Sequence, residues 1–335
     1  MPARIAINGF GRIGRAAFRL IAERDDCEVV VINDLGSLEN LAYLLKYDTA
    51  YRIYDKDVSS DGSNLVVEGK KIPVLSERDP AALPWGDMDV DVVLECTGAF
   101  VKDGAAKAHL AAGAKRVIVS APTKGENDDI QTFMMGVNHE SYLGQNVISN
   151  ASCTTNCVSP VISVLHSHFK IIKSAMTTIH GYTASQSIVD GPNEKSFRLG
   201  RAGAQNIIPS TTGAAIATTK AIPDLEGRFD GISVRVPVAV GSISDITCLV
   251  EKKTTAEEVN KAFTEASQRP FYKGVLEVTE EPIVSSDIIG NPHSAIIDLS
   301  FTRVVDGDLV KVLAWYDNEW GYANRLVEMA LLTTA

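Results

Sequence analysis

Ala-Arg-Ile-Ala-Ile-Asn-Gly-Phe-Gly-Arg-Ile-Gly, residues 3–14, decides the fold of this 335-residue chain. Its first six residues predict a short buried strand, and residues 15–24 predict a helix. Between the two, Gly9, Gly11 and Gly14 form a G-x-G-x-x-G turn. The first glycine allows the tight turn, the second lets backbone approach a pyrophosphate, and the third permits close packing of helix on strand. We therefore expect a dinucleotide-binding turn.

An acidic residue after the second predicted strand indicates which dinucleotide binds. Residues 28–33 predict that strand, and Asp34 follows it, 20 residues after Gly14. An acid at this place accepts hydrogen bonds from a ribose 2′-hydroxyl and repels a 2′-phosphate. A glycine pattern by itself is often only structural, but strand, turn, helix, strand and acid in this order form a much stronger signal. We expect NAD rather than NADP.

Apolar strands alternate with helices through the rest of the N-terminal region. Residues 91–97 and 116–121 predict strands, with a helix at 102–112 between them. Such alternation predicts an α/β fold with a doubly wound, mainly parallel sheet, whose ligand lies at the carboxyl ends of the strands. Thr97 and Ser120 stand at such ends, either as cofactor neighbours or as ordinary loop residues. Arg78 is a further expected cofactor contact.

The run Ser-Asn-Ala-Ser-Cys-Thr-Thr-Asn-Cys, residues 149–157, places a thiol just before a predicted amphipathic helix at 157–168. A helix N-terminus carries partial positive charge and unpaired N–H groups. The pKa of Cys153 is therefore expected to be lowered, and the N–H groups could hold an oxyanion beside the sulfur. From this window alone, Cys153 is either a covalent nucleophile or a buried structural cysteine.

The second half of the chain changes character. Strands are predicted at 171–180, 231–238, 241–252 and 309–316, and helices at 211–221 and 255–268. This pattern predicts an α+β catalytic domain with a mainly antiparallel sheet, residues 152–318. It follows a Rossmann NAD-binding domain, residues 1–151, that a C-terminal helix at 319–335 completes. The long segment 180–207 has little periodicity, which is typical of a functional or disordered loop.

His180 ends the first predicted strand of the second domain. It could deprotonate Cys153 and later move a proton on a substrate oxygen. It could equally be a simple hydrogen-bonded side chain, and the sequence leaves both open. The other histidines lack acidic or cysteine neighbours at metal-ligand spacing, so no metal site is predicted. Cys157 shares a helix face with Cys153, and we favour a packing role over a disulfide.

Short polar groups suited to phosphate gather in the same domain. Hydroxyls, a glycine at a helix start and arginines that offer bidentate contacts all suit this anion. The candidates are Ser152, Thr154, Thr183, Thr212, Gly213, Arg235 and, on the long loop, Arg201. Asn318 could pair its side-chain amide with a carboxamide.

Composition limits the partners and the compartment. The net charge of −10 and a pI near 5.2 do not favour nucleic acid or anionic membrane. Five cysteines are a sparse, odd number, typical of a reducing compartment. No apolar run approaches the ~20 residues that span a bilayer. The N-terminus leads straight into a strand, so we expect no targeting segment. We therefore expect a cytoplasmic location.

Nine segments in one order resemble the phosphorylating glyceraldehyde-3-phosphate dehydrogenase family over essentially the whole chain. They are Ile-Asn-Gly-Phe-Gly-Arg-Ile-Gly-Arg (7–15), Ile-Asn-Asp (32–34), Leu-Leu-Lys-Tyr-Asp (44–48), Glu-Cys-Thr-Gly (95–98), the run 149–157, Met-Thr-Thr-Ile-His (176–180), Gln-Asn-Ile-Ile-Pro (205–209), Thr-Gly-Ala-Ala (212–215) and Trp-Tyr-Asp-Asn-Glu-Trp-Gly-Tyr (315–322).

The resemblance implies oxidation of glyceraldehyde 3-phosphate by NAD and inorganic phosphate, in glycolysis or gluconeogenesis, through a thioester on Cys153 with His180 as base. It implies that Thr183 and Arg235 hold the substrate phosphate. It further implies that the attacking phosphate is bound by Ser152, Thr154, Thr212 and Gly213, with assistance from Arg201. It also implies pyrophosphate contacts from the backbone of Arg12 and Ile13, ribose contact from Asp34, a cofactor neighbour in Ser120 and carboxamide contact from Asn318. The family is usually a homotetramer.

The sequence departs from the family pattern in two places. Residues 237–244, Pro-Val-Ala-Val-Gly-Ser-Ile-Ser, replace a commoner run with Asn-Val-Ser near its centre, and Gly181 stands where serine is frequent. Because of the first departure, the sequence does not predict how residues pack behind Arg235. Arg198 could serve in place of Arg201.

Three rival functions remain open from the sequence. Erythrose-4-phosphate dehydrogenase shares the cysteine–histidine pair but hydrolyses its thioester. An NAD-responsive binding or scaffold protein, acting on RNA, is opposed by the net charge. A NADP-preferring form is opposed by Asp34.

Overall fold

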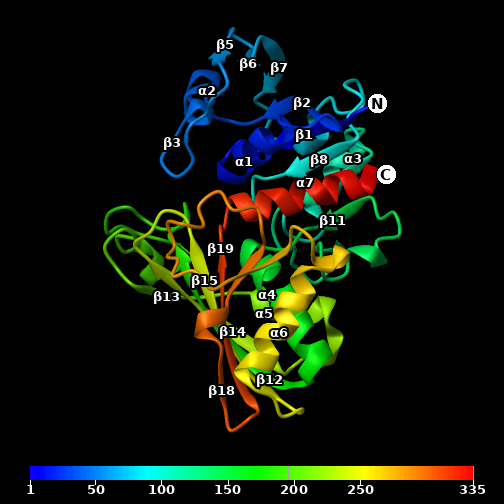
Figure 1. The fold of residues 1–335 in the computed structure, drawn as a ribbon. Helices are drawn as coiled ribbons and strands as arrows, with labels where there is room; N and C mark the ends of the chain where they lie inside the picture. Colours follow the sequence, from blue (N-terminus) through cyan, green and yellow to red (C-terminus); the bar gives the residue numbers. More distant parts are fainter. Residues whose placement is uncertain (195, 335) are drawn as a thin grey trace. The chain divides into compact units, whose positions relative to one another are not determined.

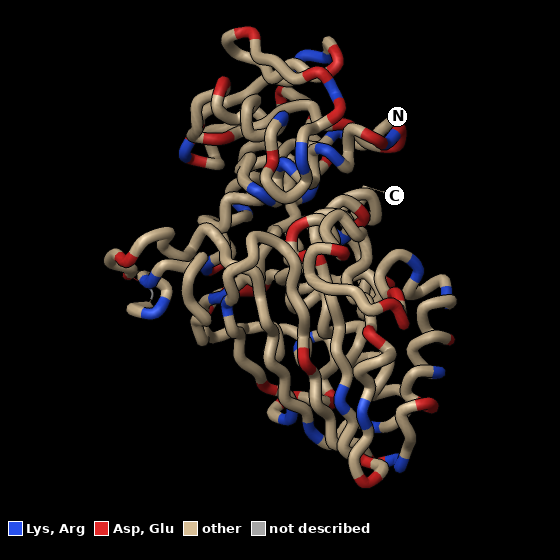
Figure 2. Tube along the Cα trace, turned by 60° about the vertical axis from the view of Figure 1, so that its left-hand side comes forward, with Lys and Arg blue, Asp and Glu red and all other residues tan. Residues whose placement is uncertain are grey.

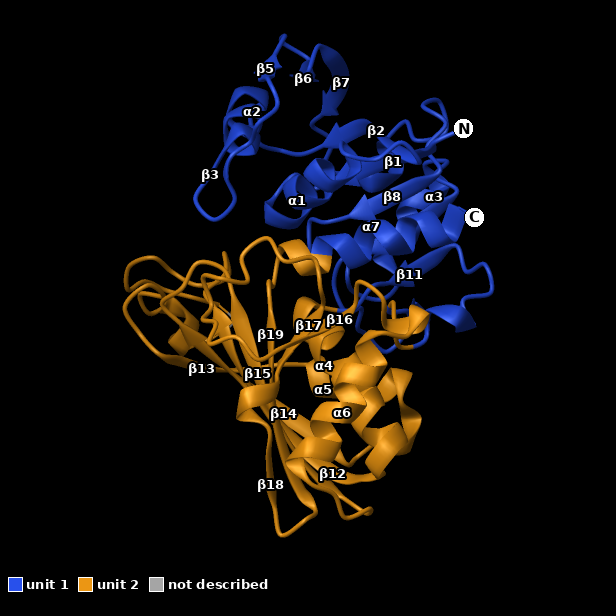
Figure 3. Cartoon of the chain, in the orientation of Figure 1, with its two compact units in different colours: residues 1–134, 138–151, 323–335 blue, residues 135–137, 152–322 orange. Residues whose placement is uncertain are grey.

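The computed structural model describes residues 1–194 and 196–334, and they form two compact units (Figure 3). Unit 1 contains residues 1–134 and 138–151 and the C-terminal segment from Ala323. Unit 2 contains residues 135–137 and 152–322. Residue 335, the last of the predicted C-terminal helix, lies outside the described part.

Unit 1 is built on a nine-stranded sheet (Figure 1). In spatial order its strands are β10 (Gln131–Thr132), β11 (Val147–Ser149), β9 (Arg116–Val119), β8 (Val92–Glu95), β1 (Ala3–Asn8), β2 (Cys27–Asn33), β7 (Lys70–Leu75), β6 (Asn64–Val67) and β5 (Val58–Ser60). The pairings from β10 to β7 are parallel, which confirms the predicted doubly wound sheet. The antiparallel meander β5–β6–β7 at one edge was not predicted.

Helices of unit 1 depart in detail from the predicted ranges. The helix α1 spans Arg12–Ile21 and begins three residues earlier than expected, because Gly11 serves as its N-cap. In place of one helix at 102–112, the chain forms a 3-10 turn, η2 (Ala105–Lys107), and a short helix, α3 (Ala108–Ala111). Gly104 precedes them in a left-handed conformation, φ +74°, which delays the helical start. The remaining elements are α2 (Leu38–Lys46), β3 (Tyr47–Asp48), β4 (Arg52–Ile53), η1 (Pro80–Ala82) and η3 (His139–Ser141).

The central strands of unit 1 are apolar on both faces. Ile5, Ile7, Val93 and Leu94 are fully buried, as a parallel sheet covered on both sides requires. Each such side chain stabilises the fold by about 1.5–3 kcal/mol relative to exposure. This rigid sheet fixes the carboxyl ends of β1, β2 and β8, where the predicted cofactor residues lie.

Unit 2 contains an eight-stranded, mainly antiparallel sheet. Its strands are β13 (Ile208–Thr211), β14 (Phe229–Val236), β12 (Ile171–Gly181), β15 (Ser242–Val250), β19 (Leu309–Tyr316), β17 (Ala295–Asp298) and β16 (Leu276–Thr279) in spatial order, with β18 (Arg303–Val305) paired to β19. Among the described strands of unit 2, only β12–β14 and β16–β17 pair in parallel. The predicted sheet type is confirmed.

Three helices pack on one face of this sheet: α4 (Cys153–Phe169), α5 (Ala214–Ala221) and α6 (Ala256–Ser267). Thr255 and Glu258 form a capping box that starts α6. The final helix, α7 (Trp320–Thr334), belongs to unit 1 from Ala323 onward. The 3-10 turns of unit 2 are η4 (Phe197–Gly200), η5 (Pro223–Leu225), η6 (Pro270–Tyr272) and η7 (Leu299–Phe301).

Helix α4 corrects two expectations. It begins at Cys153 rather than at 157, because the Ser152 side chain accepts a hydrogen bond from the N–H of Thr155 and caps the helix there. It is also not an amphipathic surface helix: residues 154–162 are buried throughout, since the sheet, α5 and α6 surround it. The cysteine therefore lies in the first turn of a buried helix.

Charged residues are dispersed along the chain. Figure 2 shows acidic and basic residues interspersed along the trace. Among the described residues, no helix combines the length and the apolarity needed to cross a bilayer.

Candidate active site

The glycine turn has the geometry expected of a pyrophosphate site. Gly9 has a φ of +93°, and a Cβ there would lie 2.7 Å from the backbone nitrogen of Thr97. A Cβ on Gly14 would lie 2.2 Å from the carbonyl oxygen of Gly9, so the helix could not pack on the strand. A Cβ on Gly11 would meet no atom within 4 Å, which leaves its face open to a ligand. The space around each glycine is compatible with the role that its place in the pattern predicts.

Asp34 is held in place by backbone. Its Oδ2 accepts a hydrogen bond from the N–H of Phe10 at 2.7 Å, and its Oδ1 accepts one from the N–H of Gly36 at 2.8 Å. Each carboxylate oxygen has a second lone pair, so both remain able to accept from ribose hydroxyls. The carboxylate is therefore pre-oriented at the end of β2.

A cavity of about 340 Å³ joins these groups within unit 1. Its lining includes the predicted residues Gly9, Gly11, Asp34, Arg78 and Thr97. It also includes Asn8, Asn33, Leu35, Glu77, Pro80, Leu83, Cys96, Ala99 and Phe100, which the sequence did not single out. One part of the cavity wall is apolar, which suits an adenine ring, and another carries amide and carboxylate groups, which suit a ribose.

Other predicted cofactor residues lie outside this lining. The guanidinium of Arg12 pairs with Asp48 and lies over the ring of Tyr51, so only its backbone is placed for a pyrophosphate. Arg12 and Ile13 open α1, where N–H groups have no intrahelical partner. The backbone N–H of Ser120 bonds to Glu95 O. The open Gly11 face, the helix start and the oriented Asp34 together fit NAD.

In unit 2, the structure brings Cys153 and His180 together. Cys153 opens α4 and His180 stands near the end of β12, yet Sγ and Nε2 lie 3.5 Å apart. His180 Nδ1 lies 2.7 Å from the carbonyl oxygen of Gly181. When Nδ1–H donates to that carbonyl, the lone pair of Nε2 faces the sulfur, which is the arrangement of a nucleophile with its base.

Burial reverses the expected ionisation of the thiol. Desolvation raises the pKa of Cys153 above its ordinary value, although the Arg235 charge and hydrogen bonds from Thr154 act in the opposite direction. The prediction of a lowered pKa was wrong because it counted the helix terminus and ignored burial. Burial, with the nearby Arg235 charge, lowers the pKa of His180 to about 3. At neutral pH the pair is therefore a thiol beside a neutral imidazole.

Arg235 stands next to this pair in the sheet. The register pairs His180 with Arg235 across β12 and β14. Arg235 Nη1 lies 2.7 Å from His180 Nδ1 and 3.3 Å from Gly181 O. A guanidinium can only donate, so the tautomer with its proton on Nδ1 requires Arg235 to direct its N–H to Gly181 O; if Arg235 donates to Nδ1 instead, the ring proton lies on Nε2. Its Nε is buried and has no hydrogen-bond partner among the described residues. A buried donor on a cation without a partner is costly, so this atom points to an anionic ligand.

The remaining phosphate candidates are arranged unevenly. Thr183 Oγ1 lies 2.9 Å from Ser185 Oγ, just after the histidine strand. Gly213 is the exposed N-cap of α5, and the Thr212 hydroxyl accepts from the N–H of Ala214. Thr154 is buried, and its hydroxyl lies 3.0 Å from the Tyr316 hydroxyl. The side chain of Thr154 thus already has a partner inside the protein.

Family models match both halves of the chain. The model described as "Glyceraldehyde 3-phosphate dehydrogenase, NAD binding domain" matches residues 3–103, and the model of the C-terminal domain of the same enzyme matches residues 152–318. The chain belongs to the glyceraldehyde-3-phosphate dehydrogenase family. The predicted family, fold class and NAD cofactor are thereby confirmed.

Curated relatives agree over almost the full length. The chain is 51% identical to glyceraldehyde-3-phosphate dehydrogenase 2 of Streptomyces avermitilis over 334 residues, 99% of this chain and 98% of the relative. It is 49% identical to glyceraldehyde-3-phosphate dehydrogenase of Geobacillus stearothermophilus, with 98% of each chain covered. It is 46% identical to glyceraldehyde-3-phosphate dehydrogenase B of Aspergillus oryzae, covering 98% of this chain and 97% of the relative.

In this member of the glyceraldehyde-3-phosphate dehydrogenase family, two residues that the sequence did not single out, Ser242 and Tyr316, contact the residues of the candidate active site. The Ser242 hydroxyl accepts from the N–H of Gly181 at 3.2 Å and donates to Asn318 Oδ1 at 3.0 Å. The N–H of Gly241 also donates to Asn318 Oδ1. These two bonds occupy the amide oxygen, which is compatible with the predicted use of the amide nitrogen as a donor to a carboxamide. Tyr316 packs edge-on against His180, with 6.0 Å between ring centroids. Its hydroxyl lies 2.8 Å from Thr178 Oγ1.

The run 237–244 contains two groups that contact Asn318. Gly241, with a φ of +99°, and Ser242 supply the two donors that orient Asn318. No single-sequence signal identifies Ser242, because its role depends on two strands and a distant loop.

Arg201 is the candidate that the structure supports least. It lies on the long loop, its side chain is 61% exposed, and its Nε donates to Asp190 at 2.9 Å. Arg198, the alternative, is also exposed. A role in binding phosphate would require Arg201 to leave Asp190.

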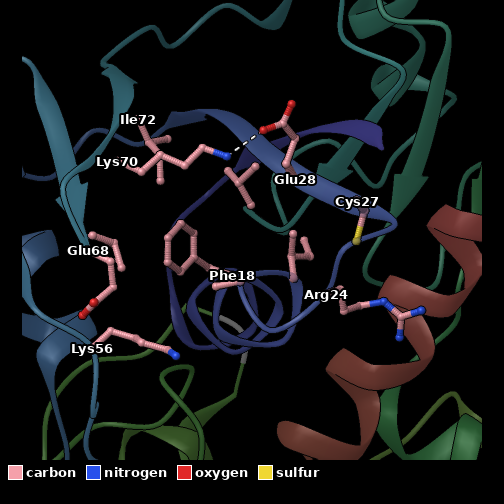
Figure 4. Close-up of a pocket in the computed structure, with 12 residues that line it drawn as sticks. Phe18, Arg24, Cys27, Glu28, Lys56, Glu68, Lys70 and Ile72 are labelled. Atoms are coloured by element: carbon pink, nitrogen blue, oxygen red, sulfur yellow. Dashed lines mark hydrogen bonds and ion pairs between the residues drawn. The ribbon is translucent and has the colours of Figure 1, made fainter. Parts of the chain in front are cut away.

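A second cavity of unit 1, of about 240 Å³, shares no residue with the cofactor pocket (Figure 4). It is lined by α1, β2, β6 and β7, with Phe18 on its wall. Its charged groups already have partners: Lys70 pairs with Glu28, and Arg24 pairs with Asp26. This cavity offers no group that the chemistry of the site requires. Among the described residues, no cluster of histidine, cysteine or acidic side chains could hold a metal ion.

Proposed function

We propose that the protein is a phosphorylating glyceraldehyde-3-phosphate dehydrogenase, which oxidises D-glyceraldehyde 3-phosphate with NAD and inorganic phosphate to 1,3-bisphosphoglycerate. The observation that carries the proposal is the 3.5 Å approach of Cys153 Sγ to His180 Nε2 beside the guanidinium of Arg235. This trio supplies a nucleophile, a base and a cation for an anionic aldehyde.

The neutral pair begins the reaction with a coupled proton transfer. Cys153 Sγ forms a bond to the aldehyde carbon while its proton passes to His180 Nε2, and the imidazolium then protonates the new oxygen to give a hemithioacetal. Burial keeps His180 neutral at rest, but its low pKa makes the imidazolium costly, so proton transfer to Nε2 must be coupled to formation of the carbon–sulfur bond. The Arg235 charge makes the imidazolium short-lived and favours return of the proton to substrate.

Oxidation and phosphorolysis follow on the same sulfur. NAD, when bound, supplies the ring that accepts a hydride from the hemithioacetal carbon. His180 takes the hydroxyl proton as the carbonyl re-forms, and Cys153 is left as a thioester. Inorganic phosphate attacks this carbonyl, the carbon–sulfur bond breaks, and His180 returns a proton to the thiolate. The thioester thereby conserves oxidation energy that hydrolysis would lose.

The two phosphates require two anion sites. We assign the substrate phosphate to Thr183 and Arg235, which is supported by the buried, unpartnered Nε of Arg235 in the described chain. We assign the attacking phosphate to Ser152, the exposed start of α5 at Thr212 and Gly213, and the backbone near Thr154. Arg201 assists only if its bond to Asp190 opens.

The direct test is NADH formation from glyceraldehyde 3-phosphate, with and without inorganic phosphate or arsenate, for the wild type and Cys153→Ser. Phosphate-dependent activity that the variant lacks supports the proposal. Turnover that does not depend on phosphate would assign the protein to a hydrolysing relative. Absence of activity on any phosphorylated aldehyde, despite tight NAD binding, would overturn the function.

We also propose that the chain assembles as a homotetramer in the cytoplasm, as the family usually does. Support comes from large apolar side chains that unit 2 exposes, namely Ile188, Val189, Phe197, Ile207 and Ile232. We expect these side chains to be covered when copies of the chain associate. Light scattering after size-exclusion chromatography should give four times the 36.0 kDa chain mass, and Phe197→Ser should lower it.

A further inference from the structure

A row of polar side chains is buried beneath the cofactor pocket of unit 1. Asn33, Asn8 and Glu95 are the last residues of β2, β1 and β8, and the strand register places Asn8 beside both of the others. They are 4%, 1% and 1% exposed. Burying three polar groups side by side is unfavourable unless each is hydrogen-bonded, so the row should serve a purpose.

The hydrogen bonds fix the direction of both amides. The backbone N–H of Glu77 donates to Asn33 Oδ1 at 2.8 Å, so Asn33 Nδ2 is the atom that donates to Asn8 Oδ1, at 2.7 Å. Asn8 Nδ2 then faces Glu95 Oε2 at 2.5 Å. A backbone N–H can only donate, and the whole row therefore runs in one direction, from Glu77 to Glu95.

His109 approaches Glu95 from the other side. The indole N–H of Trp85 lies 2.9 Å from His109 Nδ1, and an indole can only donate. Nδ1 is therefore the acceptor, and the single proton of the neutral ring sits on Nε2, 3.0 Å from Glu95 Oε2. Trp85 thus selects the tautomer that donates to the carboxylate.

Glu95 also fixes the turn that follows β8. Its Oε1 accepts from the backbone N–H of Thr97 at 2.8 Å and from the Thr97 hydroxyl. That hydroxyl accepts in turn from the N–H of Ala99 at 3.0 Å. Glu95 therefore receives four hydrogen bonds and donates none, which is the pattern of an ionised carboxylate. No lysine or arginine of the described chain pairs with it.

The network adjoins the pocket at several points. Asn8, Asn33, Thr97 and Ala99 all line the cavity that contains Asp34. Phe100, another lining residue, packs edge-on against His109 with 6.1 Å between ring centroids. A change at Glu95 would thus be transmitted to both walls of the pocket.

We propose that Glu95 is a positioning residue for NAD, and that His109 orients its carboxylate. The buried anion ties the ends of β1, β2 and β8 into one geometry and holds the 97–99 turn against the pocket. The role belongs to the adenosine end of the cofactor, since the network and the cavity lie wholly in unit 1.

The test begins with Glu95→Gln, which keeps the shape but turns an amide N–H toward existing donors. Loss of a hydrogen bond to a charged group predicts that the Kd of NAD rises by about 10- to 100-fold. The value of kcat at saturating NAD should stay within about threefold. Calorimetry with ADP-ribose, which lacks nicotinamide, should show the same loss. A Kd within twofold of the wild type in the folded variant would overturn the proposal, even if its unfolding temperature falls.

Two substitutions of His109, to Gln and to Phe, keep the test decisive if the Glu95→Gln variant does not fold. Gln at 109 can donate to Glu95 and accept from Trp85, whereas Phe can do neither. His109→Phe should weaken NAD and ADP-ribose binding by about tenfold, and His109→Gln should restore most of the affinity. Equal affinities for the two variants would contradict the proposed role. His139→Gln, in the same unit but outside the network, is the matched control.

Discussion

The cofactor pocket of unit 1 lies over a buried charged group, whereas the cysteine–histidine centre of unit 2 is buried and uncharged. Unit 1 buries an anion, Glu95, and satisfies it with four neutral donors. Unit 2 keeps Cys153 and His180 neutral beside a cation, Arg235.

The difference follows from what each region must do. A pocket that only binds gains from fixed charges, because their hydrogen bonds hold the backbone in one geometry. A centre that moves protons gains from groups whose ionisation changes during the reaction. Variants that damage one region should therefore leave the other intact, and four predictions test this separation.

The largest effect is expected for His180→Asn. Removing the base should lower kcat by about 10²- to 10⁴-fold. The Kd of NAD should not change, because the pocket in unit 1 keeps all its groups. Steady-state kinetics and calorimetry measure the two quantities. His168→Asn, at the far end of α4, is the control, and residual activity above a tenth of wild type would refute a base at position 180.

Arg235→Leu should have the next largest effect. Loss of a charge-assisted contact, about 1.5–3 kcal/mol, should lower kcat/KM for the aldehyde phosphate by roughly 10- to 150-fold. A positive charge favours thiolate and disfavours imidazolium, so its removal raises the pKa of Cys153 and of His180 alike.

The pH dependence of alkylation by iodoacetamide measures this shift. The wild-type midpoint should lie above the ordinary cysteine value, because burial raises the pKa of Cys153. In Arg235→Leu the midpoint should move to still higher pH, whereas Arg228→Leu, at an exposed loop before the same strand, should leave it unchanged. An unchanged midpoint would show that Arg235 does not act on the thiol, and a lower midpoint would contradict the sign of the effect.

Asp34→Asn tests the cofactor side. The amide can replace only one of the two carboxylate oxygens that accept from Phe10 and Gly36. We expect the Kd of NAD to rise about tenfold, or about 1.4 kcal/mol, and discrimination against NADP to weaken. The kcat at saturating NAD should hold. Asp25→Asn, an exposed acid of the same unit, is the control, and unchanged cofactor preference would refute the assignment.

Ser242→Ala should give the smallest loss. It removes a hydroxyl that joins Gly181 to Asn318, worth about 0.5–1.5 kcal/mol, and should reduce kcat/KM by roughly 2- to 10-fold. Ser244→Ala, two residues along the same strand and in contact with Cys157 instead, should alter stability more than activity. Equal kinetic effects from the two changes would mean that Ser242 does not act through Asn318.

Much of the cofactor site could be predicted from the sequence. The turn at 3–14 and Asp34 follow from short-range sterics, since a glycine needed for φ > 0 or for close approach is specified by its neighbours along the chain. The sequence also located Cys153 at a helix start, although it placed that start four residues too late. These features depend on a few consecutive residues.

The rest was decided by tertiary structure. Sheet register set His180 beside Arg235, and packing brought His180 to Cys153 across 27 residues of sequence. The pKa of Cys153 moved opposite to expectation because desolvation depends on everything that surrounds a group, whereas the helix terminus is a local feature. Glu95 and Ser242 went unnoticed for the same reason: their partners lie on separate strands, and long-range pairing and burial are not visible in any single stretch of sequence.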